Sequence, residues 1–275
     1  MSVASALTAI AEQLRYFLNV ENRYKLEDMP FEINSVFIVG FNEGTAHGEA
    51  QGEYNEYNRF WDIVQDNGNS TVENGTFAGH GWTDEIFRPK YDMIPTSANQ
   101  MFWCTGIQNL KKCLEDAGVT LDLSNAGNVT GCFSYSQLTH VPFLDIRKAK
   151  ANTGNLFSSA KMLQEISGIR VDSGNTALAN IFNTCNELVT VIFSDDSKIH
   201  SNLNLKAATK LNDTSIRSIF AALGEASTNY TLTLSLTAVN AAFDNTSQGI
   251  AGSTSQDWFD LESNAPDNWT IVLSS

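Results

Sequence analysis

Apolar residues recur along the middle of the chain with a period of 25 residues. One unit spans 157–166 and the next spans 182–191; in each, an aromatic residue precedes a small residue, a leucine and a β-branched residue. Stepping back by the same period gives a third unit at 132–141. A constant period of this length predicts stacked supersecondary units, each burying an apolar edge against its neighbours. The expected core positions are Leu138, Val141, Phe157, Leu163, Ile166, Phe182, Leu188 and Val191.

Each unit should supply two short extended pieces, and the first units depart from the period. The expected strands are 138–141, 163–166 and 188–191, with second pieces at 119–123, 144–147 and 169–172. A shorter unit begins at 101, and Ile107 to Leu138 is 31 residues, six more than the period. The extra length coincides with 111–118, which reads as a helical turn ending at Gly118.

The N-terminal segment 1–39 reads as a helical attachment or oligomerisation module. An apolar stripe along 3–18 has the spacing of one face of a helix, and a second short helix is expected near 26–33. The stripe has two interpretations: it packs on the chain's own domain, or it mediates self-association or docking. A homo-oligomer, with a trimer favoured, is expected through Leu7, Ile10, Leu14 and Phe17.

The regions on either side of the repeats read differently. Residues 40–100 form an irregular, aromatic-rich segment with one helix at 53–65. After 205 the period is lost, and a helical stripe near 212–224 precedes alternating strands near 230–236 and 269–273. The predicted fold class is therefore α+β: a short leucine-rich-repeat solenoid at 101–205, with N-terminal helices and an α/β cap at 206–275.

Charge and composition exclude several partners. The formal net charge of −14 repels phosphate backbones and anionic lipid, so neither nucleic acid nor a membrane surface is an expected partner. No apolar run is long enough for a membrane span, and the first residues lack the basic start of a signal peptide. We expect a chain made and folded in a cytoplasm, with four cysteines that are free and buried.

Motifs for catalysis are missing from the sequence. It holds no H-E-x-x-H, G-x-S-x-G, Walker A or G-x-G-x-x-G pattern. His80 reads as a surface-loop histidine, and Asp195, Asp196 and Asp213 as solvated carboxylates. The sequence thus predicts no catalytic residue, no metal site and no cofactor. Paired carboxylates for glycoside hydrolysis stay open, because their spacing is spatial rather than sequential.

The repeat units at 157–166 and 182–191 resemble BspA-like leucine-rich repeats of bacterial surface proteins and of phage and prophage structural proteins. Residues 6–15 and 25–33 are similar to the short module that opens many phage tail and appendage proteins. The stretch from 56 to 102 is similar to a segment that precedes such repeats. The resemblance implies a phage tail or appendage structural protein and no catalytic residues.

The function expected from this resemblance is a non-enzymatic virion protein assembled in the host cytoplasm: a tail fibre, baseplate or other appendage component. Its expected partners are other virion structural proteins and a host cell-surface glycan or protein. One alternative is a bacterial surface leucine-rich-repeat adhesin. A second alternative is a tail-associated polysaccharide hydrolase.

Overall fold

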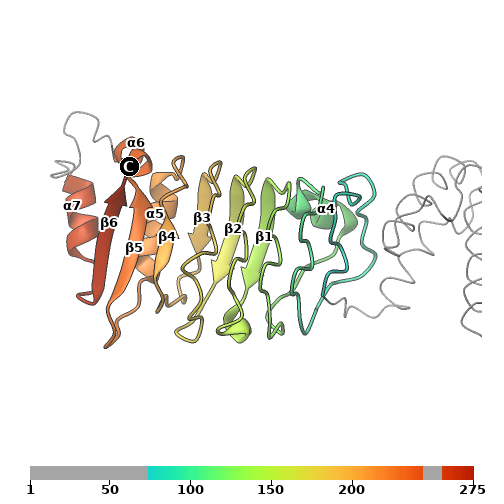
Figure 1. Ribbon diagram of the computed structural model, residues 1–275, viewed down its shortest axis with the longest axis horizontal. Helices are drawn as coiled ribbons and strands as arrows, with labels where there is room; N and C mark the ends of the chain where they lie inside the picture. The colour runs from blue at the N-terminus through green and yellow to red at the C-terminus, as the bar shows by residue number, and fades with distance from the viewer. Residues whose placement is uncertain (1–73, 244–255) are drawn as a thin grey trace, which may run out of the picture.

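The computed structural model describes residues 74–243 and 256–275. In this part of the chain, parallel units follow one another along the long axis of Figure 1, and we call this arrangement the stack. The helices expected within 1–39 and at 53–65 lie outside the described residues. So do the four residues expected at an oligomer contact: Leu7, Ile10, Leu14 and Phe17.

One parallel sheet lies on the first face of the stack. It consists of β1 (His140–Asp145), β2 (Glu165–Arg170) and β3 (Thr190–Phe193), in that order. The register follows the sequence period, since His140 pairs with Glu165 and Glu165 with Thr190. A short 3-10 helix, η2 (Arg147–Ala149), follows β1.

The strands differ from their expected bounds. The two extended pieces expected at 138–141 and 144–147 form one strand, β1, which begins two residues after Leu138. Leu138 is fully buried but precedes the first strand pairing, at His140. The apolar pattern therefore marks the core-facing positions rather than the start of hydrogen bonding.

A column of stacked phenylalanine rings runs through the core. Phe102, Phe133, Phe157 and Phe182 are fully buried, and neighbouring ring centroids lie 5.5, 5.2 and 5.7 Å apart. Their planes are nearly parallel, at 15°, 9° and 4°. The third unit therefore contributes Phe133 to the column, rather than Cys132 as the period predicts.

Tight turns return the chain at the opposite face. Equivalent places in successive units are occupied by Gly79, Cys104, Tyr135, Ser159 and Thr184. All five have a positive φ angle, from 55° for Cys104 to 100° for Gly79. Left-handed backbone is costly for residues other than glycine. The stack therefore imposes this conformation, because four of these five positions carry a side chain.

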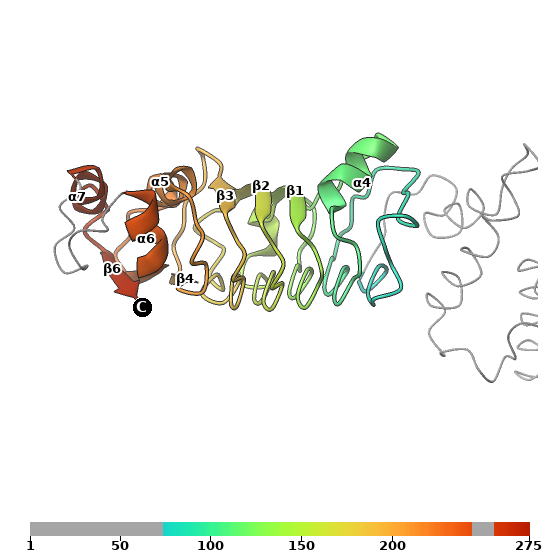
Figure 2. The same cartoon turned by 90° about the horizontal axis from the view of Figure 1, so that it is seen from above.

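A second parallel sheet continues the stack on the opposite face, as Figure 2 shows. Its strands are β4 (Leu203–Leu205), β5 (Tyr230–Ser235) and β6 (Trp269–Ser274), in that order. Leu203 pairs with Leu232, and Leu232 with Ile271. Helices connect the strands: α5 (Asp213–Ala222) lies between β4 and β5, and α6 (Leu236–Ala242) and α7 (Gln256–Ser263) lie between β5 and β6.

Helix α5 ends the first sheet by taking the place of a fourth strand. The Ser215 hydroxyl accepts from Val191 N at 3.0 Å, and the Ser218 hydroxyl accepts from Phe193 N at 2.6 Å. Both hydroxyls also donate back to carbonyl oxygens of this strand region. The outer edge of β3 is thus satisfied by side chains.

The expected fold class, an α+β leucine-rich-repeat solenoid, is wrong. The described residues form an α/β arrangement in which two parallel three-stranded sheets are joined and flanked by helices. The sequence pattern showed a single period of 25 and missed the second sheet, whose units are longer because helices connect the strands. Residues 206–275 accordingly supply two of the three strands of that sheet, rather than a separate cap.

The stack also begins earlier than residue 101. The Phe77 ring stacks on Phe102 with centroids 5.2 Å apart, and Phe77 N donates to Met101 O. Among the aromatic residues of the segment expected to be irregular, Trp82 and Phe87 are buried and Tyr91 is half-buried. No helix in the described ranges has the length and apolar character needed to cross a membrane.

Candidate binding groove between helix α4 and strand β1

The connection between the second and third units is six residues longer than the period, and it contains helix α4 (Leu110–Ala117), which has eight residues. Asn109 caps its start, with the side-chain oxygen accepting from Lys112 N, and Gly118 ends it at φ 66°. These are common start and stop signals of a helix. The helix stands beside β1 instead of continuing the sheet, as Figures 1 and 2 show.

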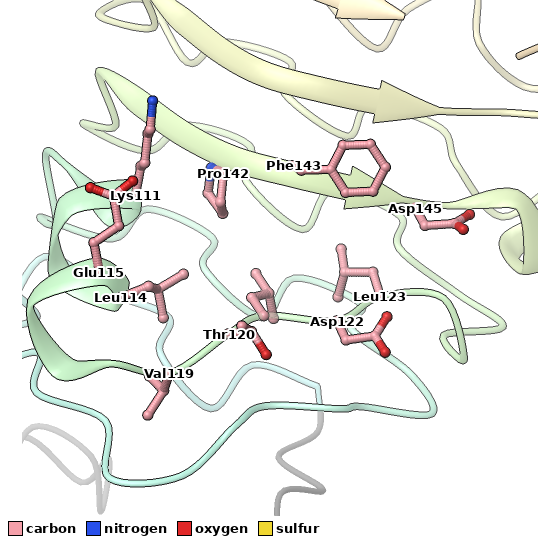
Figure 3. A pocket seen from close by; sticks show the side chains of 11 residues that line it. Lys111, Leu114, Glu115, Val119, Thr120, Asp122, Leu123, Pro142, Phe143 and Asp145 are labelled. Carbon is pink, nitrogen blue, oxygen red and sulfur yellow. The ribbon is translucent and has the colours of Figure 1, made fainter. Parts of the chain in front are cut away.

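A groove of about 440 Å³ opens between α4, the segment 119–123 and β1 (Figure 3). Its apolar lining consists of Leu114, Val119, Leu121, Leu123, Pro142 and Phe143. Four charged side chains also line it: Lys111, Glu115, Asp122 and Asp145. An apolar floor with a few charged groups is the usual composition of a ligand site.

Phe143 is the aromatic residue of the groove lining. Its side chain is 46% exposed, and it lies over Gly168 of the neighbouring strand. A Cβ atom on Gly168 would lie 2.6 Å from the ring, so the ring needs a glycine beneath it. The Arg170 guanidinium lies 5.8 Å from the ring centroid and packs over it. The ring is therefore held in place while part of it remains open to solvent.

The outer edge of β1 borders the groove. Glu165 N donates to Thr139 O at the start of β1, and Ile146 N donates to Arg170 O just after its end. The alternation of backbone groups facing β2 therefore shifts by one residue within the strand, at Pro142, which has no N–H and no paired residue on β2. The edge is closed farther up, where Thr139 N donates to Gln108 O at 2.6 Å. The groove thus occupies the part of this edge that α4 leaves uncovered.

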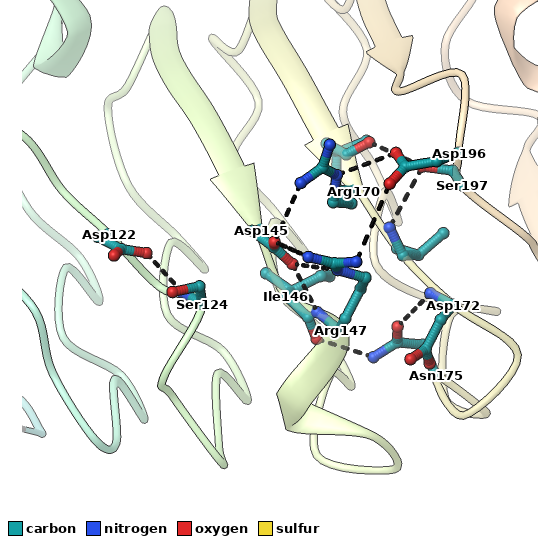
Figure 4. Close-up of polar contacts among 12 residues, drawn as sticks. Asp122, Ser124, Asp145, Ile146, Arg147, Arg170, Asp172, Asn175, Asp196 and Ser197 are labelled. Carbon is teal, nitrogen blue, oxygen red and sulfur yellow. Dashed lines mark hydrogen bonds and ion pairs between the residues drawn. The ribbon is translucent and has the colours of Figure 1, made fainter.

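An ion-pair network fixes one end of the groove (Figure 4). Arg147 donates to Asp145 at 2.7 Å, and Arg170 lies 3.6 Å from the same carboxylate. Arg170 also donates to Asp196 at 3.0 Å, which links three successive units. Burial alone would raise the pKa of Asp145, but the hydrogen bonds and charges of the two arginines outweigh it and leave the pKa lowered. Asp145 therefore stays ionised at neutral pH.

At the other end, Lys111 joins α4 to β2. Its ammonium group lies 3.0 Å from Glu165, and this hydrogen bond is the main reason that the pKa of Glu165 is lowered. The two charges of the pair are both about one-third exposed. Such a pair contributes little stability but holds the helix at a fixed place on the sheet.

The groove is suited to binding. Its ionised, arginine-paired Asp145 lacks the raised pKa that a general acid needs near neutral pH. Among residues 74–243 and 256–275, no cluster of three or more His, Cys, Asp or Glu side chains could hold a metal ion. All four cysteines are free; burial raises the pKa of Cys113 to about 11 and of Cys185 to about 12, so both remain thiols.

The sequence prediction identified the core but not the groove. All eight predicted repeat positions are fully buried, so they hold the stack together and touch no ligand: Leu138, Val141, Phe157, Leu163, Ile166, Phe182, Leu188 and Val191. Phe143 was missed, although its place one step from the core positions of β1 and the spacing of 31 residues before it were both visible. Besides Phe143, two exposed aromatic residues, Trp103 and Tyr135, lie in the turns, with ring centroids 6.2 Å apart.

Neither a protein-family model, nor a curated protein, nor a solved structure matches this chain.

Proposed function

We propose that this chain is a non-enzymatic structural protein of a phage tail or other appendage, and that the groove beside α4 binds a host cell-surface glycan. Two observations support the proposal. Residues 6–15 and 25–33 resemble the opening module of phage appendage proteins. The half-exposed ring of Phe143, held over Gly168 in a groove with a charged rim, carries the binding part.

The chemistry of the groove fits a sugar. One face of a pyranose presents C–H bonds that pack on an aromatic ring, while its hydroxyl groups donate to carboxylates. Phe143 supplies such a ring, and Glu115 and Asp122 supply carboxylates on the same groove. A neutral sugar avoids the repulsion that the net charge of −14 would impose on an anionic polymer.

Retention on host glycans tests the binding part. Purified protein is passed over immobilised cell-wall and capsular glycans of the host, and both the retained fraction and the released reducing ends are measured. We expect retention without release. Phe143→Ala should weaken it about tenfold, since it removes the ring, which corresponds to about 1.4 kcal/mol.

Phe259→Ala is the matched control. Phe259 is 59% exposed on α7, at the other end of the described stack, and its loss should leave retention unchanged. Release of oligosaccharides would instead indicate a polysaccharide hydrolase. Equal loss of retention in both variants, or no retention at all, would contradict a glycan site in the groove.

The virion part needs a separate experiment. Antibodies against the purified chain, visualised with gold on intact phage particles, should label the tail or another appendage. Label on the bacterial surface in the absence of phage would support the bacterial adhesin instead. Because the two experiments are independent, failure of one leaves the other proposal standing.

A further inference from the structure

The outer edge of β6 carries backbone groups that no described residue satisfies. Tyr230 N donates to Asn268 O, and the strands are parallel. In a parallel pair successive residues point alternately toward and away from the neighbour, so Ile271 and Leu273 direct their N–H and C=O groups away from β5. Within residues 74–243 and 256–275, no hydrogen bond reaches these groups.

This edge differs from the outer edge of the first sheet. There, Ser215 and Ser218 of α5 bond to the strand backbone of β3. On β6, the described part of the chain offers no side chain that does the same. The strand sequence also lacks the lysine or proline that commonly protects an open edge.

The apolar interior is open at the same place. Leu232 and Leu234 of β5 face inward and are fully buried. Their partners on β6, Ile271 and Leu273, pack on the same core but remain partly exposed, because no further unit covers them in the described structure. A strand placed along β6 would satisfy the backbone and extend this interior.

The chain segment that contains β6 is acidic. From residue 218 to residue 275 the sequence has six acidic residues and no lysine, arginine or histidine. Asp260, Glu262 and Asp267 are exposed close to β6 in the chain, and Asp257 is exposed beside Arg217, which lies 3.5 Å away. A second copy pairing β6 with β6 would bring two acidic ends together. The favoured occupant is therefore basic.

We propose that β6 binds an extended, basic segment of a partner protein, which adds a fourth strand to the β4–β5–β6 sheet. Main-chain hydrogen bonds to Ile271 and Leu273 would give affinity, and lysine or arginine side chains would select for the acidic surroundings. The edge belongs to the second sheet, which lies on the face opposite β1 (Figure 2). The two surfaces can therefore be tested separately.

Hydrogen exchange on the full chain tests the pairing directly. The probe is an alternating lysine–valine peptide about as long as β6, compared with a glutamate–valine peptide of the same length. Without peptide, the amides of Ile271 and Leu273 should exchange quickly, while those of Thr270 and Val272 are protected by β5. The basic peptide should protect Ile271 and Leu273, and the acidic peptide should not.

A proline variant tests the same edge by affinity. Ile271→Pro removes only an outward N–H, so the pairing with β5 should persist while the peptide binds at least about tenfold more weakly. Ile271→Val keeps the N–H and is the matched control. Circular dichroism shows whether each variant is folded; if the proline variant is not, the exchange result on the unmodified chain decides.

Three outcomes would overturn the proposal. Protected amides at Ile271 and Leu273 in the free chain would mean that the edge is already covered. Equal binding of the basic and acidic peptides, or no binding of either, would remove the basic partner. Self-association that rises with concentration and is lost in Ile271→Pro would identify the occupant as a second copy.

Discussion

Removal of one ring from the phenylalanine column should cost a large part of the stability of the stack. Phe157 is fully buried and stacks on Phe133 and Phe182, with centroids 5.2 and 5.7 Å away. Truncation of a buried phenylalanine to alanine costs about 3–5 kcal/mol, because apolar burial is lost and a cavity remains. We expect Phe157→Ala to fall in this range.

A leucine at the same position separates stacking from burial. Phe157→Leu keeps an apolar side chain in the core but loses two ring pairs, each worth about 0.5–1.5 kcal/mol. Its expected cost is therefore about 1–3 kcal/mol, clearly below that of alanine. Phe259→Ala, on an exposed ring, should change stability by less than about 0.5 kcal/mol.

Urea unfolding followed by circular dichroism measures these differences. The midpoint should fall in the order Phe259→Ala, Phe157→Leu, Phe157→Ala. Stacked units can unfold partly, so the slope of free energy against urea must be compared as well. A cost below about 1 kcal/mol for Phe157→Ala with an unchanged slope would refute the ring column as a main source of stability.

Three further predictions follow from the structure, and a fourth follows from the sequence. Leu163→Ala should cost about 2–5 kcal/mol in urea unfolding, because it opens a cavity between fully buried neighbouring units. Gly106→Ala should cost about 1–3 kcal/mol, since its Cβ would lie 2.6 Å from the carbonyl oxygen of His80; an unchanged midpoint would contradict this contact. The pKa of Asp145 is lowered from 3.8, so the folded state binds a proton at this carboxylate less readily than the unfolded state. The resulting stabilisation is present above pH 3.8 and is lost as the pH falls through the folded pKa. Asp145→Asn should lack this acid-dependent loss in urea unfolding measured at a series of pH values. Deletion of 1–39 should leave a folded monomer by sedimentation, whereas an unchanged oligomer would place the contact elsewhere.

The sequence predicted the regular part of the stack because the period reports directly on burial. Repeated leucine and β-branched positions face the core in every unit, and each is fully buried. Helix α5 was also predictable, since Asn212 caps it and its apolar stripe has helical spacing. Both signals can be read directly from the sequence: the stack from positions that recur every 25 residues, and the helix from one capping residue and its near neighbours.

The second sheet could not be predicted from the same signals. Its units are spaced by 29 and then 39 residues, as the pairs Leu203–Leu232 and Leu232–Ile271 show, so no constant period exists to detect. The pattern also misplaced the third ring by one residue, at Cys132 instead of Phe133. Strand pairing over such distances depends on which apolar faces meet in space, and alternation along one strand does not specify that partner.

Irregular units create both candidate surfaces of this protein. In regular units, side chains at fixed positions are used for the core, and each strand edge is covered by the next strand. The groove exists because a connection six residues longer than the period contains α4, which covers only part of the edge of β1. The edge of β6 is open because no described helix or strand covers it, whereas two serine hydroxyls of α5 cover the edge of β3. Substitutions in the phenylalanine column should therefore lower the free energy of unfolding while binding per folded molecule is kept. Substitutions of Phe143 or Ile271 should instead weaken binding while the free energy of unfolding is kept.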